Sequence, residues 1–84
     1  MAEILMYSTE YCPYCARARQ LLEAKKVVYT DIRIDEHPEK RDEMVAKSNR
    51  STVPQIFING NSIGGCDNLY ALEQTGQLDK LLIG

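Results

Sequence analysis

Two cysteines separated by two residues, Cys12 and Cys15, constrain this chain more than any other feature of its sequence. They follow an apolar run of strand length at residues 4–7, and residues 16–25 after them are mostly good helix formers. Pro13 suits the first helical position, where its fixed φ helps and its missing N–H costs nothing. The pattern predicts that Cys12 is the N-cap of a helix that begins soon after a buried strand.

The predicted position of Cys12 makes it the reactive thiol of the pair. A sulfur at a helix start faces the unpaired amides of Tyr14 and Cys15 and the positive end of the helix dipole, and both favour thiolate over thiol. The spacing of Cys15 to Ala18 and Leu22 places it on the stripe that faces the core. Cα atoms three residues apart on a helix are roughly 5 to 6 Å distant, within the range of a disulfide. We therefore expect Cys12 to be the nucleophile and Cys15 a less exposed thiol that acts second.

Size and charge exclude several classes of function. The 84 residues predict one domain, residues 1–84, and the net charge of −2 gives no basic field for nucleic acid. The chain contains no apolar run of about 18 residues and no basic start followed by an apolar core, so we expect no membrane partner and a cytoplasmic location. In that compartment a Cys-x-x-Cys pair beside a strand and a helix is more often catalytic or metal-binding than structural.

The remaining chain alternates short strands and helices. Strands are predicted at residues 3–8, 27–34, 55–58 and 62–63. Helices are predicted at residues 13–25, at residues 39–47 with Met44 and Val45 facing inward, and from Asp67 onward. The last helix is allowed a terminal turn through Leu78, Leu81 and Leu82. Asn59-Gly60 is a strong hairpin signal. The order β-α-β-α-β-β-α predicts an α/β fold with a mixed four-stranded sheet and helices on both faces. Ligands of such sheets usually bind at the carboxyl end of the strand from which Cys12 emerges.

Two further motifs accompany Cys12-Pro13-Tyr14-Cys15, namely Thr52-Val53-Pro54 and Gly64-Gly65-Cys66-Asp67. At these separations the three motifs resemble those of dithiol glutaredoxins of the CPYC class, in the thioredoxin-fold superfamily, and the likeness covers nearly the whole chain. The resemblance implies a thioredoxin-like fold and an oxidoreductase that uses glutathione to reduce protein disulfides and protein–glutathione mixed disulfides. It implies glutathione as co-substrate, no bound prosthetic group and no metal. Expected partners are glutathione and disulfide-containing or glutathionylated proteins, and we expect a monomer.

The resemblance also implies where glutathione binds. Thioredoxin-fold proteins carry a cis proline facing the active cysteines, so Pro54 is expected to be cis. The backbone of Val53 would then pair with the cysteinyl part of glutathione like an added strand. The amides of Cys66 and Asp67 suit the γ-glutamyl carboxylate and the Asp67 side chain suits its ammonium group, although Asp67 also suits a helix cap.

Other candidate contacts depend on residue type and leave a structural alternative open. Thr52 either orients the loop or touches the ligand, and Gly65 lets a backbone come close. Tyr14 either flanks the groove or is simply an exposed residue. Arg41 is the candidate for the glycyl carboxylate or a solvated side chain, and Asn68 stands where relatives often have Asp.

A few residues depart from the family pattern or invite other roles. Thr9 stands where glutaredoxins commonly have a Lys that assists the thiolate, and Tyr11 is bulkier than the usual residue. Arg17 and Arg19 are expected to be surface helix residues that raise the local potential. Cys66 is either a small buried apolar residue or a regulatory redox partner.

The expected reaction is thiol–disulfide exchange, with two alternatives. One is a glutaredoxin-like redoxin reduced by thioredoxin reductase, against which the glutathione-site motifs argue. The other is a glutathione-assisted iron–sulfur cluster module, but Pro13 resembles the members that hold no cluster. Structural zinc normally needs four ligands, and Cys12, Cys15 and Cys66 supply three.

Overall fold

The computed structural model describes residues 3–83 and is built on a 4-stranded sheet with the strand order β2-β1-β3-β4. The strands are β1 (Ile4–Ser8), β2 (Thr30–Arg33), β3 (Gln55–Ile58) and β4 (Asn61–Gly64). β1 runs parallel to β2 and antiparallel to β3, and β3 and β4 form an antiparallel hairpin. The predicted mixed sheet is confirmed.

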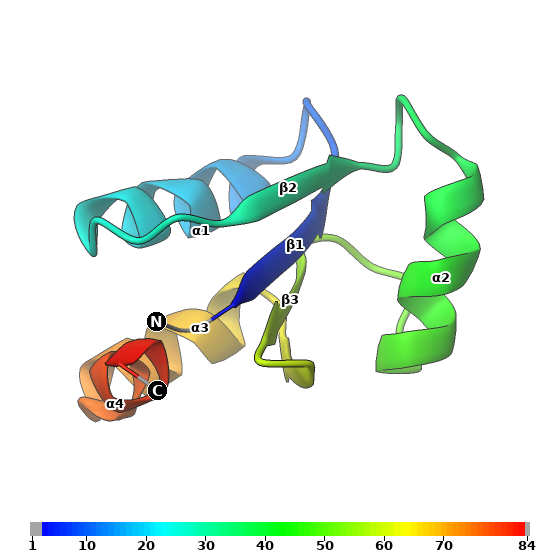
Figure 1. Cartoon of the computed structure of the whole chain (residues 1–84). Coiled ribbons are helices and arrows are strands. Elements are labelled where there is room, and N and C mark those ends of the chain that lie inside the picture. The colour runs from blue at the N-terminus through cyan, green and yellow to red at the C-terminus, as the bar shows by residue number, and fades with distance from the viewer. Residues whose placement is uncertain (1–2, 84) are drawn as a thin grey trace.

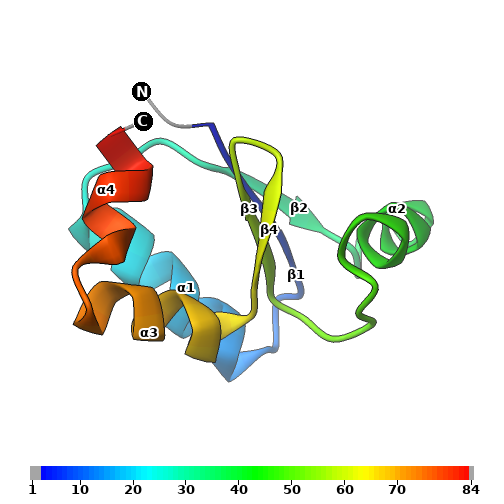
Figure 2. The same cartoon turned by 90° about the horizontal axis from the view of Figure 1, so that it is seen from below.

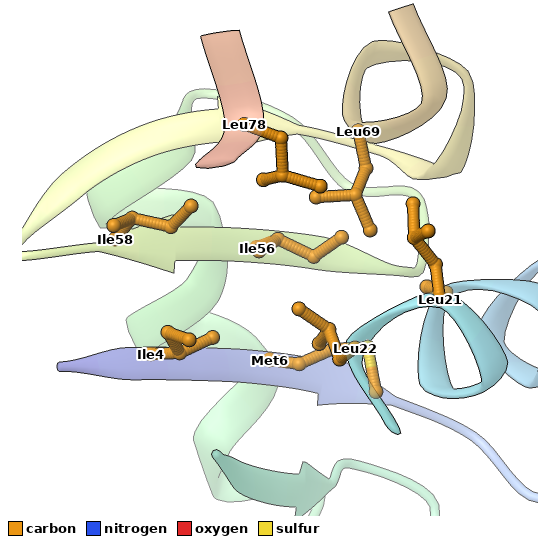
Figure 3. Packing of buried hydrophobic residues seen from close by; sticks show 9 residues of the cluster. Ile4, Met6, Leu21, Leu22, Ile56, Ile58, Leu69 and Leu78 are labelled. Carbon is orange, nitrogen blue, oxygen red and sulfur yellow. The ribbon is translucent and has the colours of Figure 1, made fainter. Parts of the chain in front are cut away.

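Helices cover both faces of the sheet (Figures 1 and 2). α1 (Pro13–Ala24), α3 (Cys66–Gln74) and α4 (Gln77–Ile83) lie on one face, and α2 (Glu39–Ser48) lies on the other. Successive strand residues point to opposite faces, so each central strand contributes to two clusters. Figure 3 shows the larger cluster, which contains Ile4, Met6, Ala18, Leu21, Leu22, Ile56, Ile58, Leu69 and Leu78. The smaller cluster under α2 contains Tyr7, Ile34, Met44 and Phe57.

The turn between β3 and β4 forms as the sequence predicts. Asn59 and Gly60 have φ values of 53° and 83°, and a two-residue hairpin turn requires positive φ at both central positions. β2 is shorter than the predicted strand 27–34, because its pairing with β1 begins where Thr30 lies opposite Leu5. In that register the residues before Tyr29 would lie opposite positions that precede β1.

Two details of the helices differ from the expectation. Val45 is 37% exposed, so the prediction that it faces inward is wrong, whereas its neighbour Met44 is fully buried. Adjacent residues of a helix point about 100° apart, and α2 meets the sheet through a narrow stripe. The terminal turn that the sequence allowed is the separate helix α4, which follows Gly76 at a φ of 78° and buries Leu78.

Candidate active site

Cys12 is the N-cap of α1, as predicted, and follows β1 by a short loop. Its backbone is extended, and its Sγ accepts a hydrogen bond from the backbone N–H of Cys15 at 3.3 Å. Pro13 is the first residue of α1, and the first turn of α1 contains no acidic residue whose negative charge would offset the positive potential of the helix N-terminus. The Cys12 side chain is half-buried, so this sulfur can be reached by another thiol or disulfide.

Cys15 is a different kind of thiol because it is fully buried. Burial is the main cause that raises the pKa of Cys15 to about 12, and the neighbouring Cys12 raises it further. A backbone hydrogen bond from Thr9 and the positive charge of Arg19 act in the opposite direction. The two cysteines are both unpaired, and only Cys12 combines access with a helix N-terminus.

A groove of about 190 Å³ lies beside Cys12. It is lined by Tyr14, Arg50, Thr52, Val53, Pro54, Gly65, Cys66, Asp67 and Asn68. These residues come from the start of α1, the loop before β3 and the start of α3. The Cys12 thiol lies 3.7 Å from the carbonyl oxygen of Val53, which places the sulfur next to this groove. The structure thus brings together all of the sequence-predicted contacts except Arg41.

The loop before β3 forms one wall of the groove. The Val53-Pro54 peptide bond is cis, as the resemblance implied. Gln55 is fully buried, and its Nε2 donates hydrogen bonds to the carbonyl oxygen of Thr52 at 3.0 Å and to Thr52 Oγ1 at 3.3 Å. The Thr52 hydroxyl therefore takes part in orienting the loop. Gln55 was not among the residues predicted from the sequence, although an amide directly after the proline of an apolar strand was a signal that could have identified it.

The start of α3 forms the opposite wall. Gly65 is the N-cap of α3, and its N–H donates a hydrogen bond to Asn68 Oδ1 at 3.1 Å. Gly64 has a φ of 110°, and a Cβ at this residue would lie 2.5 Å from Asn68 Oδ1. A Cβ at Gly65 would lie 3.4 Å from the carbonyl oxygen of Pro54, so the two walls come close here. Asp67 is exposed in the first turn of α3, and the N-cap of this helix is Gly65 and not Asp67, which leaves the Asp67 carboxylate available for a ligand.

Arg50, and not Arg41, is the arginine that lines the groove. Arg50 Nη1 lies 3.4 Å from Asn68 Oδ1. Arg41, near the start of α2, donates a hydrogen bond from Nη2 to the carbonyl oxygen of Ser51 at 3.1 Å. Arg41 does not line the groove, because its side chain reaches the loop before β3. The binding of the glycyl carboxylate by Arg41 stays a prediction.

Three other residues of interest in the sequence are also placed. Cys66 is buried, and burial followed by the charge of Asp67 raises the pKa of its thiol. Tyr11 is 88% exposed beside Cys12. The expectation that Arg19 is a surface residue is wrong, because its side chain is only 20% exposed and is paired with Asp31.

No group of three or more His, Cys, Asp or Glu residues in the range 3–83 could hold a metal ion. No helix in the same range is long and apolar enough to cross a membrane.

Known proteins resemble this chain in both sequence and fold. The glutaredoxin family profile matches residues 4–63. Glutaredoxin 3 of Escherichia coli (strain K12) is 52% identical over 82 residues, which cover 98% of this chain and 99% of that protein. The solution structure of glutaredoxin from Brucella melitensis is 49% identical, with a TM-score of 0.84 over 98% of this chain and 89% of that one.

A third relative was solved together with a small molecule. The crystal structure of a buckwheat glutaredoxin–glutathione complex is 28% identical to this chain, with a TM-score of 0.89. The match covers 98% of this chain and 77% of that one. Together with the Cys12 and Cys15 pair at the start of α1, these matches show that the chain belongs to the glutaredoxin family of thiol–disulfide oxidoreductases.

Proposed function

We propose that this protein is a glutathione-dependent oxidoreductase that reduces protein–glutathione mixed disulfides through Cys12 and protein disulfides through Cys12 and Cys15. The single observation that carries the proposal is the contrast between the two thiols. Cys12 is accessible at a helix N-terminus, while Cys15, whose N–H contacts the Cys12 sulfur, is buried and protonated. The glutathione complex of the buckwheat relative supports glutathione as the co-substrate.

Removal of glutathione from a protein needs Cys12 alone. The Cys12 thiolate attacks the glutathionyl sulfur, the bond between glutathione and the protein breaks, and the protein thiolate leaves and takes up a proton. Glutathione now forms a mixed disulfide with Cys12. A second glutathione thiolate attacks the glutathionyl sulfur of this adduct, which releases oxidised glutathione and restores Cys12.

Reduction of a protein disulfide needs both thiols. Cys12 attacks one sulfur of the substrate and forms a mixed disulfide, and the other substrate sulfur leaves as a thiolate. Cys15 then loses its proton and attacks Cys12, so the Cys12–Cys15 disulfide forms and the second substrate thiolate leaves. Two glutathione molecules reduce this disulfide. The known potentials of glutaredoxins, about −200 to −230 mV, lie close to biochemical values of about −220 to −260 mV for the cytosolic glutathione pool.

The groove supplies contacts for each part of glutathione. The Val53 backbone, beside the Cys12 sulfur, pairs with the cysteinyl part in the manner of an added strand. The backbone amides of Cys66 and Asp67, at the start of α3, receive the γ-glutamyl carboxylate, and the Asp67 carboxylate receives its ammonium group. Arg50 adds positive charge to the groove.

The other predicted contacts keep supporting roles in this proposal. Tyr14 flanks the groove, Thr52 and Pro54 shape its loop wall, and Gly65 and Asn68 shape the start of α3. Arg41 remains the candidate for the glycyl carboxylate. The absence of a prosthetic group, the protein partners, the monomeric state and the cytoplasmic location stay predictions.

The electron source tests the proposal directly. Purified protein is given a glutathionylated peptide together with NADPH and either glutathione with glutathione reductase or thioredoxin reductase alone. We expect NADPH oxidation in the first case and none in the second. Turnover with thioredoxin reductase alone would favour the redoxin alternative, and a coloured protein with stoichiometric iron would favour the cluster-binding module.

A further inference from the structure

The side chain of Arg19 connects three elements beneath the loop that carries Cys12. From α1, its Nε donates a hydrogen bond to Asp31 Oδ2 on β2 at 2.7 Å. Its Nη2 donates to Ser8 Oγ at the end of β1 at 2.8 Å and to the carbonyl oxygen of Thr9 at 3.3 Å. One guanidinium therefore fixes the end of β1 and the first peptide of the active-site loop at the same time.

The partners of Arg19 leave it little freedom. Ser8 is fully buried, and its hydroxyl donates to Asp31 Oδ1 while it accepts from Arg19. The Arg19 and Asp31 side chains are only 20% and 24% exposed, so the pair is screened less than a surface ion pair. The fork geometry of a guanidinium is needed here, because Nε and Nη2 serve different partners.

Arg19 binds the carbonyl oxygen of Thr9, where the active-site loop begins. The backbone of Thr9 and the charge of Arg19 both lower the pKa of the buried Cys15 thiol, against the larger effect of its burial. Arg19 also follows Cys15 by four residues on α1, so both side chains lie on one side of the helix.

We propose that Arg19 is a positioning residue for the second thiol: it fixes the Thr9 end of the active-site loop, and its positive charge, four residues from Cys15 on the same helix, favours that sulfur as it becomes a thiolate. This inference rests on the proposed function, because it assigns a role in the step in which Cys15 attacks. The hydrogen bonds of Arg19 go to Asp31, Ser8 and Thr9, so it acts on Cys15 through the loop and through its charge.

The step itself is balanced without any further reactant. In the mixed disulfide, Cys15 gives up its proton to solvent and its thiolate attacks the Cys12 sulfur. The Cys12–Cys15 bond forms, the bond from Cys12 to the substrate sulfur breaks, and the electron pair leaves on the substrate thiolate. The demanding part is the loss of the Cys15 proton, because burial raises the pKa of this thiol to about 12 while Thr9 and Arg19 act against that rise.

The charged and titratable groups around this step are few. Cys12 and Arg19 act on Cys15. Asp31 pairs with Arg19. The pKa of the Tyr29 hydroxyl is raised by burial and by the charges of Glu23 and Asp31, while Arg19 lowers it. Among these groups only the cation of Arg19 favours a negative Cys15.

The test separates the two thiols in time. Ellman's reagent reacts first with Cys12, which releases one coloured thiolate and leaves a mixed disulfide. Attack by Cys15 on this mixed disulfide then releases the second coloured thiolate, in a phase whose rate does not depend on the concentration of the reagent. All variants carry Cys66→Ser, so that the third thiol does not contribute to the signal.

Arg19→Met is expected to slow the second phase about fivefold to tenfold at pH 7, the effect of losing one ordinary intramolecular hydrogen bond. The pH dependence of the second phase should also shift to higher pH, while the first phase keeps the rate of the parent. Arg19→Lys keeps the charge and loses the fork, so it should retain the pH profile and recover part of the rate. Arg17→Met is the matched control: it removes an exposed arginine of the same helix and should change neither phase.

An unchanged second phase in folded Arg19→Met would overturn the inference, and so would an equal slowing of both phases. If Arg19→Met does not fold by circular dichroism, Arg19→Lys decides: a rate equal to the parent overturns the role of the fork. The measurement uses no glutathione. A failure here therefore leaves the proposed function standing, and a failure of glutathione-dependent turnover leaves this result intact.

Discussion

The hydroxyl of Tyr7 donates a hydrogen bond of 2.5 Å to Glu43 Oε2 and so joins β1 to α2. The Tyr7 ring is fully buried and packs edge to face with the Phe57 ring at a centroid distance of 5.8 Å. Burial, followed by the contact with Glu43, raises the pKa of the Tyr7 hydroxyl, and the same hydrogen bond lowers the pKa of Glu43. A buried phenol thereby anchors the helix that covers the smaller cluster.

Tyr7→Phe should therefore lower the stability at neutral pH, because the ring still packs while the Glu43 carboxylate loses its donor. The folded-state pKa of Glu43 is depressed, so its contribution is present above the unfolded value of about 4.3 and is lost as the pH falls through the folded value. The folded-state pKa of Tyr7 is raised, so the stabilisation by its neutral form is lost as the pH rises above about 10. Urea unfolding at a series of pH values from acid to alkaline measures the free energy of unfolding, and so shows the loss through Glu43 in acid and the loss through Tyr7 in alkali.

Tyr70→Phe is the control for this pH dependence. The Tyr70 hydroxyl donates to the backbone carbonyl oxygen of Arg17 at 3.1 Å, an acceptor that does not titrate. The stability difference of this variant should stay constant in acid. A constant difference for Tyr7→Phe as well would contradict the assigned role of Glu43.

Alkylation should distinguish the three cysteines. Iodoacetamide at pH 7 is expected to modify Cys12 in the native protein and to leave Cys15 and Cys66 nearly intact, because burial raises the pKa of both of these thiols. Peptide mass spectrometry gives the site and rate of modification, and unfolding in urea should make all three reactive. Equal native rates for Cys12 and Cys15 would rule out the contrast on which the proposed function rests.

Serine substitutions should separate the two reactions. Cys12→Ser should abolish reduction of both substrate types, since it removes the nucleophile. Cys15→Ser should keep removal of glutathione from a peptide and lose reduction of a protein disulfide, because nothing resolves the mixed disulfide. Parallel assays with a glutathionylated peptide and a disulfide-bonded protein check this, and equal losses in the two variants would refute the division of roles.

Gly64→Ala should weaken both the fold and the groove. An alanine would be strained at a φ of 110° and its Cβ would lie 2.5 Å from Asn68 Oδ1, so we expect a loss of roughly 1–3 kcal/mol. The displaced Asn68 should also raise the KM for glutathione. Gly76→Ala is the control, since Gly76 has a φ of 78° with open space around it and would suffer backbone strain alone.

Equal losses in the two glycine variants would show that the contact with Asn68 is unimportant. Chemical denaturation gives the difference in the free energy of unfolding, and initial rates at varied glutathione concentration give the KM. Gly76 lies between α3 and α4, away from the groove, so its variant should keep the parental KM.

Features encoded locally could be predicted from the sequence. The start of α1 at Pro13 follows from φ and N-cap preferences of adjacent residues, and the turn at Asn59 and Gly60 follows from their tolerance of positive φ. The cis state of Pro54 came from the resemblance, because X-Pro bonds in folded proteins are cis in only about 5 to 6% of cases.

Features that depend on tertiary packing could not be predicted in the same way. The start of β2 is set by its register against β1, which the residues of β2 do not contain. Arg41 and Arg50 are both arginines near α2 in the sequence, and only the path of the chain after α2 decides that Arg50 lines the groove. Arg19 meets Asp31 because β1 and β2 pair in parallel beside α1, and Val45 faces outward because α2 has a narrow contact stripe.

The outer strands of the sheet have a consequence for how the protein behaves at high concentration. β2 and β4 are each 4 residues long, and β2 carries Asp31 and Arg33. Short edge strands, and charged side chains such as those on β2, are what natural sheets use against edge-to-edge pairing into aggregates. At high concentration, the sheet therefore offers few unpaired backbone groups with which the strands of other molecules could pair.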